Sequence, residues 1–413
     1  GPWMDSVQVI PGKDYHRGGV EVAVHFGGGV PARVQLRVAF DGAEGEIRED
    51  VPVSDGVARW NCTVPSAKVW SPDSPQLHAL RVVLFDASGA EADDAEVRFG
   101  LRRIEAREGA LWLNGEVLKL RGVCRHEWHP NSGLSTPTIQ MMADLQLIRG
   151  LGGNFIRGSH YPQDQRFLDL CDEVGMLVWE ENLGSGQGEE SFSDPKFRAD
   201  HLQTTRAMVR ASANHPSVIM WGFLNEGRIG GECVRAVFEE NASLLRTLDP
   251  SRLVTFASNR PMNNPQFDLA DVISINVYPG WYECDDVEEP LDLIRPYLRE
   301  CFAAIDASGF ADKPVLVSEI GAEAIYGWHD AHNDFFTEEY QAEYLRRACT
   351  EAVENPRCCG ISIWHFSDIR TYSGSRSMKR PRTYNNKGIF DEYRRPKAAV
   401  SAVAEIFRQA AKK

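Results

Sequence analysis

Short runs of alternating apolar and polar residues characterise the N-terminal quarter of the chain. The clearest runs are 20–24, 33–38 and 80–84, and turn-rich pieces such as Gly27-Gly28-Gly29 and Asp55-Gly56 separate them. A period of two places one face of each strand in a core and the other in solvent, which is typical of antiparallel sheets. The pattern therefore predicts an Ig-like β-sandwich over residues 1–104. The residues suggest no catalytic constellation there, so we expect a structural role for it.

A different pattern begins near residue 105, where apolar runs alternate with helical stretches. Several of these runs are continuous, as expected for strands buried on both faces. Eight such runs predict a (β/α)8 barrel, a TIM barrel, over residues 105–413. A doubly wound sheet is the alternative, but residues 122–125 do not form the glycine-rich turn that it needs after its first strand. The candidate strands are 118–123, 154–157, 176–180, 218–222, 253–257, 272–276, 315–319 and 360–364, and the candidate helices include 138–150, 163–174, 200–212, 231–248 and 338–354.

Polar and aromatic residues gather at the carboxyl ends of the predicted strands, where catalytic groups of a TIM barrel lie. A single strand-end glutamate is more often a salt-bridge partner, so only the collective placement indicates an active site. The residues are Arg121 and His126 after the first strand, Arg157 and His160 after the second, Glu180 and Glu181 after the third, Asn225 and Glu226 after the fourth, Tyr278 after the sixth, Glu319 on the seventh and Trp364 on the eighth.

Glu226 and Glu319 lie three strands apart, and a barrel can point such a pair toward each other across its mouth. Two carboxyl groups about 5–5.5 Å apart fit retaining glycoside hydrolysis, with one as nucleophile and the other as acid and then base. Asn225 could donate to a sugar hydroxyl, and Trp364 offers a flat face for a pyranose ring. The competing interpretation is that both glutamates form structural ion pairs.

Composition narrows the choice of partners. The 413 residues carry 45 Lys and Arg against 59 Asp and Glu, a formal net charge of −14, which argues against a nucleic-acid binder. No apolar run reaches the roughly 18–20 residues of a membrane span, and we expect no membrane association. The nine cysteines are scattered without a C-x-x-C pair, which favours a cytoplasmic protein with reduced thiols; a secreted or periplasmic form is the alternative.

Longer motifs carry a resemblance. Arg121 to Glu127 reads RGVCRHE, Arg157 to Pro162 reads RGSHYP, and residues 214–221 and 224–226 read NHPSVIMW and LNE. Together with residues 69–72 and 99–102, these motifs resemble glycoside hydrolase family 2, the family of β-galactosidases and β-glucuronidases. The resemblance implies that Glu226 is the acid/base and that Glu319 is the nucleophile. It also implies a set of substrate-binding residues: Asn225, His126, Arg157, His160, Tyr278, Trp364, Asn385 and Lys387.

The sugar is expected to be a uronic acid. Asn385 and Lys387, in the run YNNKGIF, are similar to the N-x-K element with which β-glucuronidases hold the sugar carboxylate. An ammonium group gains strongly from an anionic substrate and little from a neutral one. A solvated loop lysine is the plainer interpretation of Lys387. The basic loop 370–382 is likewise either a solvated loop or a lid over an anionic sugar.

Four alternatives stay open. Residues 125–130, RHEWHP, are similar to the β-galactosidase form of that loop, but Gly184 and Gly186 stand where large galactosidases place magnesium ligands. We therefore expect no metal and no cofactor. A β-galacturonidase is a further alternative, because its substrate differs from a glucuronide only in the configuration of the C4 hydroxyl. A catalytically weak carbohydrate-binding remnant and a scaffold are the non-enzyme alternatives.

Family members usually begin with a jelly-roll domain that contributes to the sugar site, whereas this sequence starts directly with the predicted sandwich. One wall of the sugar site is therefore expected to be open or supplied by a neighbouring chain, which makes a homo-oligomer one option.

Overall fold

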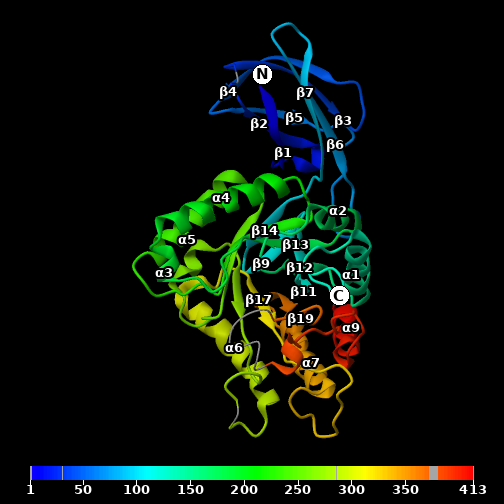
Figure 1. The fold of residues 1–413 in the computed structure, drawn as a ribbon, viewed down its shortest axis with the longest axis vertical. Coiled ribbons are helices and arrows are strands. Elements are labelled where there is room, and N and C mark those ends of the chain that lie inside the picture. The colour runs from blue at the N-terminus through cyan, green and yellow to red at the C-terminus, as the bar shows by residue number, and fades with distance from the viewer. Residues whose placement is uncertain (1, 30, 285, 372–379, 413) are drawn as a thin grey trace.

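The N-terminal part of the molecule is a β-sandwich that stands at one end of a larger barrel (Figure 1). The structure, a computed structural model, describes residues 2–29, 31–284, 286–371 and 380–412, so most of the basic loop 370–382 lies outside the described residues. The sandwich strands are β1 (Trp3–Pro11), β2 (Gly19–Gly27), β3 (Arg33–Phe40), β4 (Glu46–Ser54), β5 (Val57–Thr63), β6 (His78–Phe85) and β7 (Glu91–Phe99).

These strands are antiparallel and follow the order β1-β2-β5-β4-β3-β6-β7. β4 pairs with β3 along most of its length but with β5 only through Val53 and Ser54, so the sheet folds over at β4 into two layers. The alternation seen in the sequence is the alternation of the core: Val22, Leu36 and Leu80 are fully buried between the layers. The predicted sandwich is confirmed.

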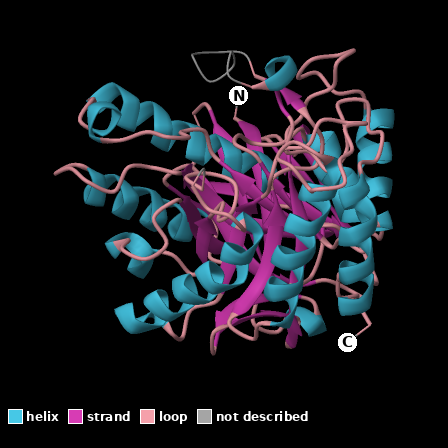
Figure 2. Ribbon diagram, turned by 90° about the horizontal axis from the view of Figure 1, so that it is seen from below, coloured by secondary structure: helices cyan, strands magenta, loops and turns pink. Residues whose placement is uncertain are grey.

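Eight parallel strands form the closed barrel, and the last pairs with the first. All of their described residues except Arg121 are buried, which explains the continuous apolar runs. The predicted TIM barrel is thus confirmed, and Figure 2 shows its strands in magenta with helices around them. The strands are β11 (Leu120–Arg125), β12 (Phe155–Gly158), β13 (Leu177–Glu181), β14 (Val218–Asn225), β15 (Leu253–Ser258), β16 (Ile273–Asn276), β17 (Val315–Ile320) and β18 (Cys358–Ile363).

Helices cover the outside of the barrel, and each contributes apolar side chains to the layer between helices and strands. Among the described residues, no helix combines the length and apolar character that crossing a membrane requires. The α-helices are α1 (Thr138–Gly150), α2 (Gln165–Val174), α3 (Glu189–Phe192), α4 (Pro195–Ser212), α5 (Val234–Leu248), α6 (Ile294–Ile305), α7 (Glu338–Glu354) and α9 (Ala398–Ala410).

A small sheet that the sequence analysis did not anticipate lies between sandwich and barrel. It consists of β8 (Ile104–Arg107), β9 (Ala110–Leu113) and β10 (Glu116–Leu118). Its Leu111 and Leu113 pack with Leu120, Phe155 and Leu177, which begin or lie near the beginning of barrel strands. The small sheet therefore closes the amino end of the barrel, and the first barrel strand begins at Leu120 rather than at residue 118.

The segments that connect the sandwich to the barrel also contact the amino end of the barrel. The buried Arg102 guanidinium donates to the carbonyl oxygens of Pro216, at 3.1 Å, and Val218, at 2.7 Å, beside the start of β14. Trp70 donates its indole N–H to the Asp172 carbonyl at 2.9 Å. These contacts occupy the amino end of the barrel, so its carboxyl end is left for the loops that carry the candidate site.

Candidate active site

Most of the candidate residues named from the sequence come together at the carboxyl end of the barrel, at the end of a strand or in the loop that follows it. Arg157 is on β12, Asn225 on β14 and Glu319 on β17, whereas His126, His160, Glu226, Tyr278 and Trp364 directly follow or soon follow their strands; Asn385 and Lys387 belong to the long connection after β18.

Arg121 and Glu180, also named from the sequence, do not join this group. Arg121 is the second residue of β11, and its guanidinium donates to the Gly152 and Lys119 carbonyl oxygens, which precede β12 and β11. The Glu180 carboxylate accepts from Ser212 on α4 at 3.1 Å, because neighbouring residues of a strand point to opposite faces and Glu181 points to the inner one.

Glu319 is a nearly buried carboxylate with strong donors on both oxygens. Its Oε1 accepts from Arg157 Nη1 at 2.8 Å, and its Oε2 accepts from the Tyr278 hydroxyl at 2.7 Å. Burial raises the pKa of Glu319 above its usual value, while Arg157 and His160 oppose the rise and Glu226 adds to it. Burial and the Glu319 charge raise the pKa of Tyr278 well above its usual value, so that its hydroxyl remains a donor.

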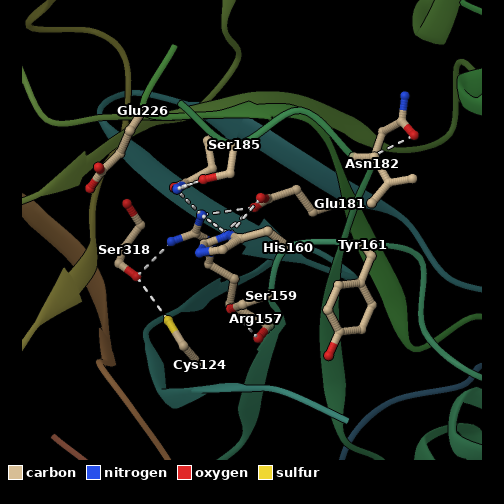
Figure 3. Close-up of polar contacts among 12 residues, drawn as sticks. Cys124, Arg157, Ser159, His160, Tyr161, Glu181, Asn182, Ser185, Glu226 and Ser318 are labelled. Carbon is tan, nitrogen blue, oxygen red and sulfur yellow. Dashed lines mark hydrogen bonds and ion pairs between the residues drawn. The ribbon is translucent and has the colours of Figure 1, made fainter. Parts of the chain in front are cut away.

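Arg157 lies beneath this carboxylate and joins it to a second one. Its guanidinium is fully buried and donates to Glu181 Oε2 at 2.8 Å as well as to Glu319, and it lies over the Trp179 ring at 4.5 Å. Figure 3 shows Arg157 between Glu181 and the Ser318 backbone. Burial alone would raise the pKa of Glu181, but Arg157 and His160 outweigh it and hold the pKa below its usual value. Arg157 thus binds protein carboxylates rather than facing the mouth.

Glu226 directly follows β14, three strands before the β17 strand that carries Glu319, and the residue is partly exposed. Its Oε1 accepts from the Asn276 amide at 3.0 Å, and its backbone has a φ of 49°, in the left-handed region that few side chains adopt. The Asn276 amide also donates to Asn225 at 3.0 Å, and its oxygen accepts from Arg157 at 3.4 Å. Asn276 and Arg157 therefore connect the two glutamates through an unbroken set of hydrogen bonds.

Rings form one wall of the mouth. The His160 imidazole stacks on the Trp364 indole with centroids 5.1 Å apart and planes 13° from parallel, and His126 meets the edge of both. Burial, with smaller coulombic contributions from His160, Arg157 and Arg125, lowers the pKa of His126 to about 3. His126 is therefore neutral near pH 7, and its ring carries one donor and one acceptor nitrogen.

Lys387 is buried in the loops beside this wall. Its ammonium donates to the Tyr282 hydroxyl at 2.9 Å and to Glu323 Oε1 at 3.1 Å. Nearby, the Asn385 amide lies 3.1 Å from Arg380 Nη1 and 3.2 Å from Trp364 Nε1; both are donors, so the amide oxygen faces them. Lys387 is therefore no solvated loop residue, and Asn385 links its loop to the ring wall.

Sequence reasoning missed two residues that hold this arrangement, Asn276 and Glu323, and gave a third, Glu181, no role. Asn276 ends the sixth barrel strand and Glu181 ends the third, so strand-end position was the signal for both, although only Glu181 was noted and without a role. Glu323 lies four residues after Glu319 in a loop, and no local pattern indicated that it would contact Lys387.

Two family models cover nearly the whole chain. The model of glycosyl hydrolases family 2 matches residues 4–102, and the model of the TIM barrel domain of that family matches residues 104–411. The chain belongs to glycosyl hydrolases family 2. The resemblance inferred from the motifs is thereby confirmed at the level of the family.

Relatives within family 2 include β-glucuronidases. The chain is 30% identical to the dog β-glucuronidase over 98% of its own length and 61% of that protein, and 30% identical to the enzyme of Streptococcus agalactiae over 80% of its length and 57% of that protein. The chain thus spans about three fifths of the length of these curated relatives.

Solved structures of family 2 show the same fold. A β-galacturonidase from Eisenbergiella tayi bound to galacturonate superposes with a TM-score of 0.88 and 37% identity, over 99% of this chain and 72% of that one. A β-glucuronidase from Bifidobacterium dentium complexed with coumarin-3-O-glucuronide superposes with a TM-score of 0.86 and 26% identity, over 98% and 67%.

Proposed function

We propose that this family 2 chain hydrolyses terminal β-D-uronides with retention of configuration, and that a β-D-glucuronide is its substrate. The observation that carries the proposal is the buried Lys387 ammonium at the same mouth as Glu226 and Glu319. A cation held there favours a sugar that carries a carboxylate. The β-glucuronidases among the relatives support the same substrate class.

In the first step Glu319 is the nucleophile. One of its oxygens attacks the anomeric carbon while the glycosidic C–O bond breaks, and a covalent glycosyl ester forms. Glu226 gives its proton to the leaving oxygen, so the aglycone departs as an alcohol. The hydrogen bonds from Arg157 and Tyr278 favour the ionised form of Glu319 before attack, which counteracts its burial.

In the second step Glu226, now ionised, takes a proton from water. The water oxygen attacks the anomeric carbon, the ester bond to Glu319 breaks, and the uronic acid leaves with the original configuration. The Asn276 amide, which donates to Glu226 Oε1 at 3.0 Å, orients this carboxylate in both steps. Arg157 is fully buried and its guanidinium donates to Glu319, Glu181 and Asn225, so we assign it as a positioning residue for Glu319.

The remaining predicted residues have roles in holding the sugar. Lys387 and Asn385 receive the carboxylate, and Trp364 with the stacked His160 provides an apolar face for the ring. His126 offers hydrogen bonds to hydroxyl groups without competing as a cation, since its pKa is about 3. Asn225, whose amide is bound by Arg157 and Ser185, shapes the floor beside Glu226.

A β-D-galacturonide is the second candidate. The structural relative bound to galacturonate has 37% identity, above the 26% of the relative bound to a glucuronide. The two sugars share the carboxylate and differ at C4, so Lys387 favours both equally. A β-galactoside lacks the carboxylate and is expected to bind less well.

The test is turnover by the full chain of nitrophenyl β-glucuronide, β-galacturonide and β-galactoside, with NMR to follow the anomer first released. Release of β-uronic acid from either uronide supports the proposal, and the ratio of the two kcat/KM values decides the C4 preference. Preference for the galactoside would contradict the assignment of Lys387. Saturable sugar binding without release from any of the three would favour the carbohydrate-binding alternative.

A further inference from the structure

The Lys387 ammonium lies in an environment that is costly for a cation without a partner. The residue is 1% exposed, and its Nζ lies 5.8, 5.0 and 4.7 Å from the ring centroids of Tyr278, Trp281 and Tyr282. Aromatic faces attract a cation, but a buried charge also needs an opposite charge or hydrogen-bond acceptors at short range.

Glu323 supplies that charge. The residue is 4% exposed; its Oε1 accepts from Lys387 Nζ at 3.1 Å and lies 3.6 Å from Arg380 Nε. Its Oε2 accepts from the backbone N–H of Asn386 at 3.4 Å and from the Asn386 side-chain amide at 3.2 Å. Glu323 therefore joins the Lys387 side chain to the backbone of the segment that carries Asn385 and Lys387.

All these partners are hydrogen-bond donors. Only a carboxylate offers acceptors on both of its oxygens, whereas a glutamine of the same length would turn an N–H toward either Lys387 or Asn386. Tyr282 provides the second acceptor for the ammonium. Its hydroxyl oxygen accepts from Lys387 Nζ at 2.9 Å, and half of the Tyr282 residue is exposed.

We propose that Glu323 and Tyr282 are positioning residues that fix the Lys387 ammonium for the substrate carboxylate, so that discrimination between charged and neutral sugars depends on Glu323 as well as on Lys387. The inference rests on the proposed function. Lys387, Arg380 and Glu323 together carry one positive charge in excess, and a uronate brings the one negative charge that balances it. A misplaced ammonium loses a charge-assisted hydrogen bond made with the bound sugar, so the effect falls on KM for uronides.

The experiment is a double-mutant cycle on the full chain with nitrophenyl uronide and galactoside. Glu323→Gln is expected to raise KM for the uronide roughly tenfold while changing its kcat little. In a Lys387→Gln background the same change should alter that KM by less than about twofold, because its effect runs through the ammonium. Glu288→Gln, an exposed charge removed from the loop that also carries Tyr282, is the matched control and should leave KM unchanged.

Tyr282→Phe is a second test that does not depend on Glu323→Gln folding, because the Tyr282 side chain is exposed. We expect this variant to raise KM for the uronide roughly threefold. An unchanged or lowered KM in the folded variants, or an equal effect of Glu323→Gln in both backgrounds, would overturn the inference. If the unmodified chain hydrolyses no glycoside, the proposed function fails by itself. Calorimetric binding of D-glucuronate and D-galacturonate then tests the positioning role with the same variants and the same expected fold-changes in Kd.

Discussion

Two charge clusters at the barrel mouth have opposite composition. Around Glu319, two carboxylates share one arginine, since Arg157 is bound by both Glu181 and Glu319. Around Lys387, two cations share one carboxylate, since Glu323 lies against both Lys387 and Arg380. The first cluster has one more carboxylate than guanidinium group, with the His160 imidazole against both carboxylates, and the second has one more cation than carboxylate. On the proposed function, each excess is complementary to what it meets, a positively charged oxocarbenium-like centre or a uronate.

The clusters also differ in how they are supported. Arg157, Glu181 and Glu319 belong to β12, β13 and β17, so three barrel strands fix their positions. Glu323, Lys387 and Tyr282 belong to loops that follow β17, β18 and β16. Groups on strands are held more firmly than groups on loops, whereas loops tolerate exchange of residues. On the proposed function, this arrangement suits a reaction centre that must be accurate beside a recognition site that can be altered.

The largest expected effect comes from removing the charge of Glu319. Glu319→Gln should lower turnover of nitrophenyl β-glucuronide by ~10³-fold or more, because an amide cannot form the glycosyl ester. The measurement is kcat with the thermal unfolding temperature beside it. Glu232→Gln, an exposed charge in the loop after β14, is the control and should retain full turnover. Comparable loss in both variants would mean that the cluster around Glu319 is not the reaction centre.

Removing Arg157 from the cluster around Glu319 should destabilise the folded protein. Arg157→Met leaves Glu181 and Glu319 buried without their shared cation, and removal of one partner from a buried ion pair costs roughly 3–5 kcal/mol of unfolding free energy. Chemical denaturation measures the change. Arg166→Met, which removes an exposed arginine paired with Asp164, should cost less than about 1 kcal/mol. Equal losses of unfolding free energy in the two variants would show that Arg157 does not offset the burial of Glu181 and Glu319.

The positive cluster is tested by its selectivity. Lys387→Ala should reduce kcat/KM for the glucuronide about 10- to 100-fold relative to the galactoside, because one charge-assisted hydrogen bond is lost for the charged sugar alone. The measurement is the ratio of the two kcat/KM values. Normal cleavage of glucuronide by Lys387→Ala would remove the assignment of the substrate carboxylate to this lysine.

The smallest expected effect is a shift in pH dependence. Because burial raises the pKa of Glu319, the ionised nucleophile and hence kcat/KM should be lost, as pH falls, at a pH above the usual 4.5 of a glutamate. The Tyr278 hydroxyl stabilises the ionised form, so Tyr278→Phe should raise that pKa further and move the acid limb upward by about one pH unit. A limb that stays in place, or moves to lower pH, would argue against Glu319 as the group that titrates.

Much of the framework was predictable from local patterns. Alternation at 20–24, 33–38 and 80–84 predicted the sandwich, and the continuous apolar runs predicted the barrel strands. A strand buried on one face alternates apolar and polar residues, whereas a strand buried on both faces is apolar throughout. Strand-end position then indicated Glu226 and Glu319 as candidate catalytic residues. The small sheet of β8, β9 and β10 escaped notice because its strands are too short to show a period.

The sequence by itself therefore determined the class of fold, the strands that carry the two glutamates and the family motifs. Only the tertiary structure decided what each charge is paired with: Arg157 lies under Glu319 rather than facing the mouth, Asn276 connects to Glu226, and Glu323 meets Lys387 from 64 positions away. The physical reason is that periodicity records burial, which is local, whereas an ion pair between two loops exists only after closure of the barrel has brought their strands to one rim.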